Sequence, residues 1–197
     1  MRWSMQGVIA SARFASGDRF FIGYWDDTPL GPFTDVMWAR PDGTRVLLAP
    51  DQSAADFITG VYDFDRVQIA TVQATGGQRF LELTAGPVEV QLKAGVGYRI
   101  PFPRKPWMTR WVEGPLARLA FGVDAYSVTP RGVRRWYRID EHRPINAGWA
   151  TVDGRDLGAL IQRSSIVKAR PLLEDPSGGL DEIVRAAARQ RVAVTSG

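Results

Sequence analysis

The sequence contains no cysteine and a single histidine, His142. The absence of cysteine excludes disulfide frameworks, thiolate metal sites and a cysteine nucleophile. One imidazole beside charged neighbours offers no cluster of metal ligands, so we expect no metal site. The sequence also lacks a G-x-S-x-G motif and a glycine-rich phosphate loop, which argues against serine hydrolases and nucleotide-binding enzymes. We expect no cofactor.

Lysine and long apolar runs are also scarce. Three of the 25 basic residues are lysines, namely Lys93, Lys105 and Lys168. The net charge is +4, but the 21 acidic residues are interspersed with the basic ones, so we expect no nucleic-acid partner. The N-terminal stretch has no apolar signal-peptide core, and no membrane-spanning run follows. We therefore expect no membrane partner and a cytoplasmic location.

The sequence is rich in aromatic residues and in short strand-like segments. Its 197 residues suit a single domain spanning 1–197. Two apolar-aromatic runs, Phe20–Trp25 and Phe33–Trp38, flank an acidic Pro/Gly connection. Alternating patterns and Gly-containing turns predict the following strands: Met5–Phe14, Arg19–Trp25, Phe33–Ala39, Arg45–Leu48, Arg66–Ala74, Gln78–Thr84, Val88–Lys93, Leu116–Thr129, Val133–Asp140, Pro144–Val152 and Ser164–Arg170.

Helical periodicity is confined to short segments. Gln52–Val61 has one apolar face, and Ser53 followed by Asp56 resembles a capping box. A C-terminal helix is predicted at about 180–191, and Pro106 can open a short third helix. Strands and helices do not alternate as in parallel α/β folds. The pattern favours an α+β fold, mainly antiparallel β, in which a curled sheet or cone-like barrel is flanked by two or three helices.

Two segments resemble the acetoacetate decarboxylase superfamily. The first, DTPLGPFTD at Asp27–Asp35, is similar to an L-G-x-Y-T-E segment at that family's active site, with Phe33 for Tyr and Asp35 for Glu. The second begins at Asp156-Leu157, continues through Ile161 to Ser164-Ser165-Ile166, and resembles a D-L-P…I-V-S-S-S-H-I run. The resemblance implies a cone-like antiparallel barrel with an apolar interior, and it implies a site role for Asp35.

The family's activity depends on a lysine that forms a Schiff base with a β-keto acid, and a second lysine lowers its pKa. The corresponding segment here, Ser53–Gly60, contains no amine. Lys168 is the best of the three substitutes, yet each lysine is best interpreted as an ordinary solvated side chain. The resemblance therefore implies the scaffold without Schiff-base chemistry.

Three functions remain open from the sequence. The first is binding of a small organic acid or apolar metabolite in an aromatic-lined cavity. Its ligand-binding residues would be Arg19, Trp25, Phe33, Trp38, Tyr98 and Arg99.

The second function is an enzyme acting on a keto acid, in which Asp35 is the general acid or base. A buried Asp35 would need a partner, for which Arg19 or Arg99 could serve. The third is a non-catalytic interaction domain that presents an exposed Trp136 and the proline-rich stretch 101–111. Homo-oligomerisation is left open.

Overall fold

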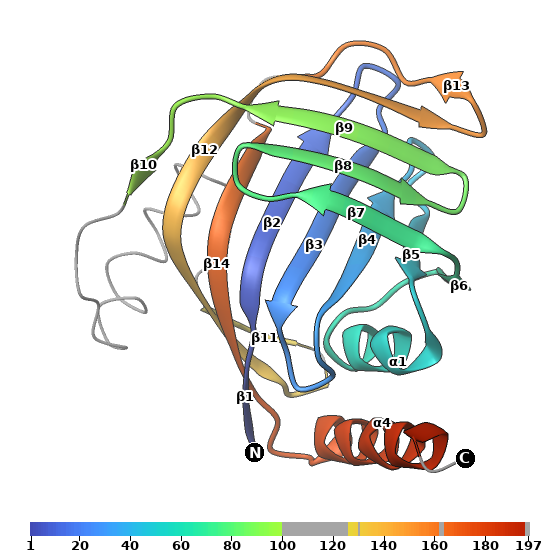
Figure 1. Cartoon of the computed structure of the whole chain (residues 1–197), viewed down its shortest axis with the longest axis vertical. Helices are drawn as coiled ribbons and strands as arrows, with labels where there is room; N and C mark the ends of the chain where they lie inside the picture. The colour runs from blue at the N-terminus through green and yellow to red at the C-terminus, as the bar shows by residue number, and fades with distance from the viewer. Residues whose placement is uncertain (100–125, 130, 162–163, 196–197) are drawn as a thin grey trace.

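The computed structural model describes residues 1–99, 126–129, 131–161 and 164–195. In this part of the chain a 14-stranded sheet curls into a half-barrel accompanied by two helices, α1 (Gln52–Val61) and α4 (Gly179–Thr195) (Figure 1). The α+β, mainly antiparallel fold expected from the sequence is confirmed. The strands are β1 (Arg2–Ser4), β2 (Gln6–Arg13), β3 (Arg19–Asp27), β4 (Phe33–Ala39), β5 (Arg45–Ala49), β6 (Arg66–Ile69), β7 (Val72–Gly76), β8 (Phe80–Ala85), β9 (Val88–Ala94), β10 (Tyr98–Arg99), β11 (Tyr126–Val128), β12 (Arg134–Val152), β13 (Arg155–Asp156) and β14 (Ser165–Glu174).

The strand order along the sheet is β6-β5-β4-β3-β2-β14-β12-β9-β8-β7. β5 and β6 pair in parallel, whereas the other described pairs are antiparallel. A parallel pair needs a crossover connection, and α1 provides it. The prediction of one strand over Arg66–Ala74 is therefore wrong, because β6 joins β5 and β7 turns away to pair with β8.

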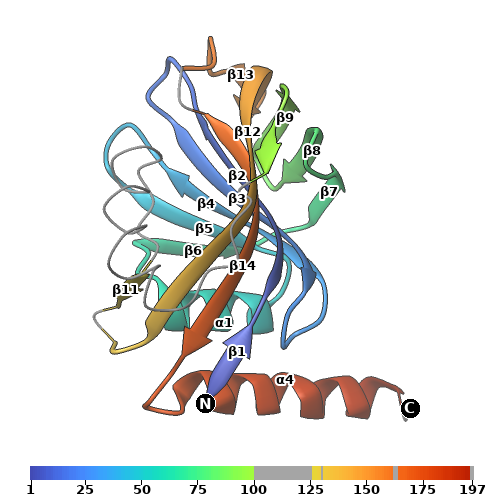
Figure 2. The same cartoon turned by 90° about the vertical axis from the view of Figure 1, so that its left-hand side faces the viewer.

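The long strand β12 folds the sheet over itself. Its first part pairs with β14 and its last part with β9, so β7, β8 and β9 lie across one face of β2, β3 and β4 (Figure 2). The sequence predicted two strands here, Val133–Asp140 and Pro144–Val152. They form one strand, because the carbonyl of Pro144 accepts a hydrogen bond from the amide of Gly95 and two β-bulges allow the strand to bend. Those bulges lie between Ile139 and Glu141 and between Ile145 and Ala147.

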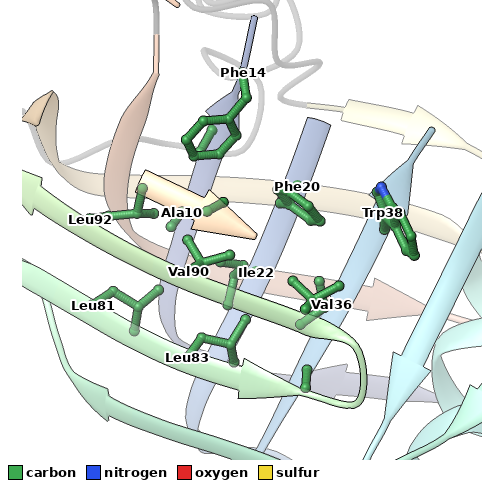
Figure 3. Close-up of a cluster of buried hydrophobic side chains, with 14 of the residues drawn as sticks. Ala10, Phe14, Phe20, Ile22, Val36, Trp38, Leu81, Leu83, Val90 and Leu92 are labelled. Carbon is green, nitrogen blue, oxygen red and sulfur yellow. The ribbon is translucent and has the colours of Figure 1, made fainter. Parts of the chain in front are cut away.

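The main core fills the space between the two layers (Figure 3). Phe20 stacks on Trp38 with ring centroids 6.0 Å apart and meets Phe14 edge-on at 6.1 Å. From the opposite layer, β8 and β9 contribute Leu81, Leu83, Val90 and Leu92. Complete burial of one such large side chain contributes roughly 1.5–3 kcal/mol to folding.

A second cluster occupies the other face of the sheet, under α1 and α4. The N-cap of α1 is Asp51, whose carboxylate accepts from the amide of Ala54 at 2.8 Å, so the predicted cap at Ser53 is wrong. α4 lies so close to α1 that a Cβ atom on Gly60 would stand 2.7 Å from Leu180. In Figure 1 the N-terminus lies beside the start of α4.

Two predictions concern the segment before β12. β11 pairs with β12 in antiparallel register, Val128 opposite Arg134, which confirms the hairpin around 130–132. The rest of the predicted strand Leu116–Thr129, and the predicted short helix at 106–111, fall outside the described residues. Neither described helix has the length and apolar character needed to cross a membrane.

Candidate functional site

An apolar cavity of about 390 Å³ opens on the helix face of the sheet. β2, β3, β4, β12 and β14 form its floor, while α1 and β11 contribute its sides. The lining residues are mostly apolar: Met5, Ile9, Phe21, Gly23, Trp25, Met37, Phe57, Ile58, Val61, Tyr62, Ser127, Arg135, Tyr137, Ile139, Val167, Pro171 and Leu173. Alternation along each strand sends these side chains to this face and their neighbours into the main core.

Asp35 lies beneath the cavity wall and has no exposed surface. Its Oδ1 accepts a hydrogen bond from the indole Nε1 of Trp25 at 2.8 Å. Its Oδ2 has no hydrogen-bond partner within the described residues. Burial raises the pKa of Asp35 from 3.8 to about 7, and the Trp25 hydrogen bond opposes only part of that effect. The carboxyl group therefore changes charge near neutral pH.

Gly23 makes the close approach of Trp25 and Asp35 sterically possible. It pairs with Asp35 across β3 and β4, and a Cβ atom there would lie 2.4 Å from the indole nitrogen of Trp25 and 2.6 Å from Oδ1 of Asp35. Any larger side chain would displace one of the two groups. Because Gly23 and Trp25 both line the cavity, the buried carboxyl stands directly behind its wall.

The polar side of the cavity is formed by Arg135 and two tyrosines. The guanidinium group of Arg135 lies 4.5 Å from the ring centroid of Tyr62, and its Nε donates to Ser127 Oγ at 3.0 Å. The hydroxyl groups of Tyr62 and Tyr137 are hydrogen-bonded to each other. Burial raises the pKa of Tyr137 well above its usual value, and the neighbouring Tyr62 raises it further. The Tyr137 phenol therefore stays neutral at physiological pH.

The structure does not bring the predicted aromatic site residues together. Trp25 lines the cavity, and Phe33 packs in the adjoining cluster under the helices. Trp38 lies on the opposite face of the sheet, inside the main core, where its indole donates to Asp18 at 2.7 Å. Tyr98 is 49% exposed and lies against the His142 ring at 5.2 Å.

Arg19, one of the two arginines suggested as partners, does not pair with Asp35 in the described part of the chain. Arg19 is exposed at the opposite end of β3 from Trp25. Arg99 pairs through its backbone with Glu141, and its side chain lies outside the described part. Among the described side chains, the indole of Trp25 is the hydrogen-bond partner of Asp35.

Sequence reasoning missed Arg135, Tyr137 and Tyr62. The alternation of Arg135, Tyr137 and Ile139 along β12 was the available signal, because it separates them from Arg134 and Arg138 on the other face. Tyr62 is the residue just after α1 and comes from a segment 75 positions away from Tyr137. Trp136, expected to be exposed, is partly buried.

No described lysine lines this cavity. Lys93 is exposed on β9, Lys168 faces the other side of the sheet, and Lys105 lies outside the described residues. Within the described chain, no three Asp, Glu or His side chains gather closely enough to hold a metal ion.

The chain has a distant structural likeness to a known protein. No family model matches the chain, and neither does any curated protein. Among solved structures, the chain is similar to one described as "Structural Studies of Acetoacetate Decarboxylase". The two are 11% identical over 87% of this chain and 84% of that chain, with a TM-score of 0.42. The proposals below therefore rest on the geometry of this chain alone.

Proposed function

We propose that the apolar cavity binds a small organic acid that has an apolar body and a single carboxylate. One observation carries the proposal: among the described lining residues, Arg135 is the one charged side chain in a largely apolar cavity of about 390 Å³. Pockets of this size and composition suit small molecules, and their few polar groups set orientation. Binding is non-covalent, because the described wall offers no amine for a Schiff base.

Arg135 is well placed for this role. Its Nε bond to Ser127 and its position over the Tyr62 ring hold the guanidinium group in one orientation. A fixed guanidinium fork binds a carboxylate through two parallel hydrogen bonds. The surrounding apolar side chains reduce competition from water, which strengthens the ion pair.

Asp35 adds a dependence on pH. Below pH 7 its carboxyl group is mostly protonated and does not repel an anionic ligand. Above pH 7 it ionises behind Gly23 and Trp25, and the two carboxylates repel each other. We expect affinity for the acid to fall as pH rises from 6 to 8, and Asp35→Asn to remove that fall.

The test compares straight-chain carboxylic acids of four to eight carbons with primary alcohols of matched length, by calorimetry and Trp fluorescence. Wild type binds the acids. Arg135→Gln weakens acid binding by about tenfold or more, as expected for loss of a charge-assisted hydrogen bond, while alcohol binding changes little. Arg134→Gln is the matched control, because Arg134 is exposed on the opposite face of β12 and lies near Glu174. Failure of every acid to bind, or equal losses in the two variants, would contradict the proposal.

A second candidate function is catalysis on a keto acid, with Asp35 as general acid or base. The observation in its favour is the pKa of about 7, since proton transfer is most effective when that value lies near the working pH. Trp25 must then move from Asp35 to admit substrate. Turnover by wild type that is lost in Asp35→Asn with binding retained would support catalysis, whereas an absence of turnover across a keto-acid panel would leave binding as the function.

A further inference from the structure

A second cavity, of about 410 Å³, lies on the opposite side of the sheet. It is a cleft between the main layer and the β7–β8 turn, and its character is polar. The lining residues are Val8, Tyr24, Asp26, Gly76, Gly77, Gln78, Arg79, Phe80, Arg143 and Lys168. The two cavities share no lining residue.

The floor of the cleft is a row of side chains across four strands. Lys168 of β14 pairs with Val8 of β2, and Val8 pairs with Tyr24 of β3. On its other side Lys168 pairs with Glu141 of β12. Cross-strand partners point to the same face of a sheet, so these groups converge on one surface.

Arg143 is held rigidly at one end of that row. It forms an ion pair with Glu141, and its Nη1 donates to the carbonyl of Gly95 at 3.3 Å. The stem packs against Gly97, where an added Cβ atom would stand 2.4 Å from the Arg143 Cγ. Its Nε is buried and has no hydrogen-bond partner among the described residues.

The other two cations of the cleft are Lys168 and Arg79. Within the described chain, no carboxylate lies within ion-pair distance of Lys168 or Arg79. Lys168 is partly buried. Asp26 is the remaining acid in the lining, and Glu141 is already engaged by Arg143. The cleft therefore retains an excess of positive charge.

The turn that covers the cleft has a fixed shape. Gly76 adopts a φ of +126°, and a Cβ atom there would lie 2.3 Å from the carbonyl oxygen of Phe80. Gly77 donates its amide to that same carbonyl at 2.8 Å. Arg79, which follows in this turn, also lines the cleft.

We infer that this cleft is a binding site for a small oxyanion, a carboxylate or a phosphate. Lys168 and Arg79 provide the charge, and Arg143 lines the cleft beside them. The site is separate from the apolar cavity and does not depend on the function proposed for it.

The test measures binding of inorganic phosphate and, in a second arm, of acetate to the full chain by calorimetry at constant ionic strength. Wild type binds at least one of them saturably. The anion that binds more tightly shows whether the site prefers a phosphate or a carboxylate. Lys168→Met weakens that binding about tenfold. Asp26→Asn, which removes the opposing charge, strengthens it about two- to threefold. An increase in affinity is a result that a damaged fold would not produce.

Two control variants locate the site. Lys93→Met changes an exposed lysine on β9, outside the cleft, and should leave binding within twofold. Arg135→Gln changes the other cavity and should also leave it unchanged. No saturable binding in either arm would overturn the inference, as would a loss in Lys93→Met or Arg135→Gln equal to that in Lys168→Met.

Discussion

Gly23 and Asp35 face each other across β3 and β4, and the Oδ1 atom of Asp35 occupies the space that a side chain at Gly23 would need. The indole of Trp25 enters the same space and donates to that oxygen at 2.8 Å. The missing Cβ atom therefore allows a buried carboxyl group and a large ring to meet beside an apolar cavity.

The first prediction concerns Gly23→Ala. The added Cβ atom would stand less than 3 Å from both partners, so the Trp25–Asp35 hydrogen bond must break or the strands must separate. We expect a loss of about 2–4 kcal/mol in unfolding free energy, because the site is overpacked and a buried carboxyl group loses its hydrogen bond. Urea unfolding measures it. Gly77→Ala, where a Cβ atom meets nothing within 4 Å, is the matched control, and similar losses in both variants would rule out this explanation.

The second prediction concerns stability against pH. The pKa of Asp35 is raised from 3.8 to about 7, so between pH 4 and pH 7 the folded protein holds a proton that the unfolded chain releases. Stability must therefore fall as pH rises through this window, by about 1.4 kcal/mol per pH unit and about 4 kcal/mol in total. The stability that depends on the protonated carboxyl group of Asp35 is fully present below pH 4.

Asp35→Asn isolates that effect, because the amide is close in shape and does not titrate. The unfolding free energy of wild type minus that of Asp35→Asn should fall steadily from pH 4.5 to pH 7. Urea titrations at each pH measure it. Glu82→Gln, at an exposed position on β8, should leave the wild-type slope intact. Parallel profiles for wild type and Asp35→Asn would mean that Asp35 is not the titrating group.

The third prediction concerns Tyr137. Burial and the neighbouring Tyr62 raise its pKa well above the usual value, so it should ionise later than Tyr98. Tyrosinate absorbance followed to high pH should lose a late step in Tyr137→Phe. Tyr98→Phe should remove an earlier step, because the pKa of Tyr98 is raised by partial burial alone. Loss of the same step in both variants would contradict the assignment.

The fourth prediction concerns Asp175, which anchors the start of α4. Its carboxylate accepts from the amides of Ser177 at 2.9 Å and Leu180 at 2.8 Å. Asp175→Ala should cost about 1–2 kcal/mol and speed amide exchange in the first turn of α4. Asp156→Ala is the control, because Asp156 accepts from the Gly158 amide in an exposed turn that starts no helix. Unchanged exchange in α4 would show that Leu180 packing alone holds the helix.

Local chemistry explains why much of the fold could be predicted from the sequence. The turn at Pro41-Asp42-Gly43 contains Gly43 at a φ of +87°, and such turns fix hairpins within a few residues. The 3.6-residue pattern from Ala54 to Val61 likewise specifies the buried face of α1. Both signals act over distances that one window of sequence covers.

The site could be predicted only in part, because strand register decides which side chains share a face. Trp25 and Trp38 were assigned to one pocket. The connection between β3 and β4 does not fix their pairing, and the register places Trp38 opposite Phe20 and Trp25 opposite Phe33. The two indoles therefore lie on opposite faces. Contacts such as Tyr62 with Tyr137 depend on how the whole sheet curls, and no local pattern encodes that.

The bulge in β12 between Ile139 and Glu141 assigns odd-numbered residues of one strand to two different chambers. Ahead of it, Arg135 and Tyr137 face the apolar cavity, whereas beyond it Arg143 faces the oxyanion cleft. If Asp140 paired regularly instead of forming the bulge, uninterrupted alternation from Ile139 would place Glu141 and Arg143 on the same face as Arg135 and Tyr137. The one extra residue in β12 thus determines that the guanidinium group of Arg143 belongs to the oxyanion cleft and not to the apolar cavity.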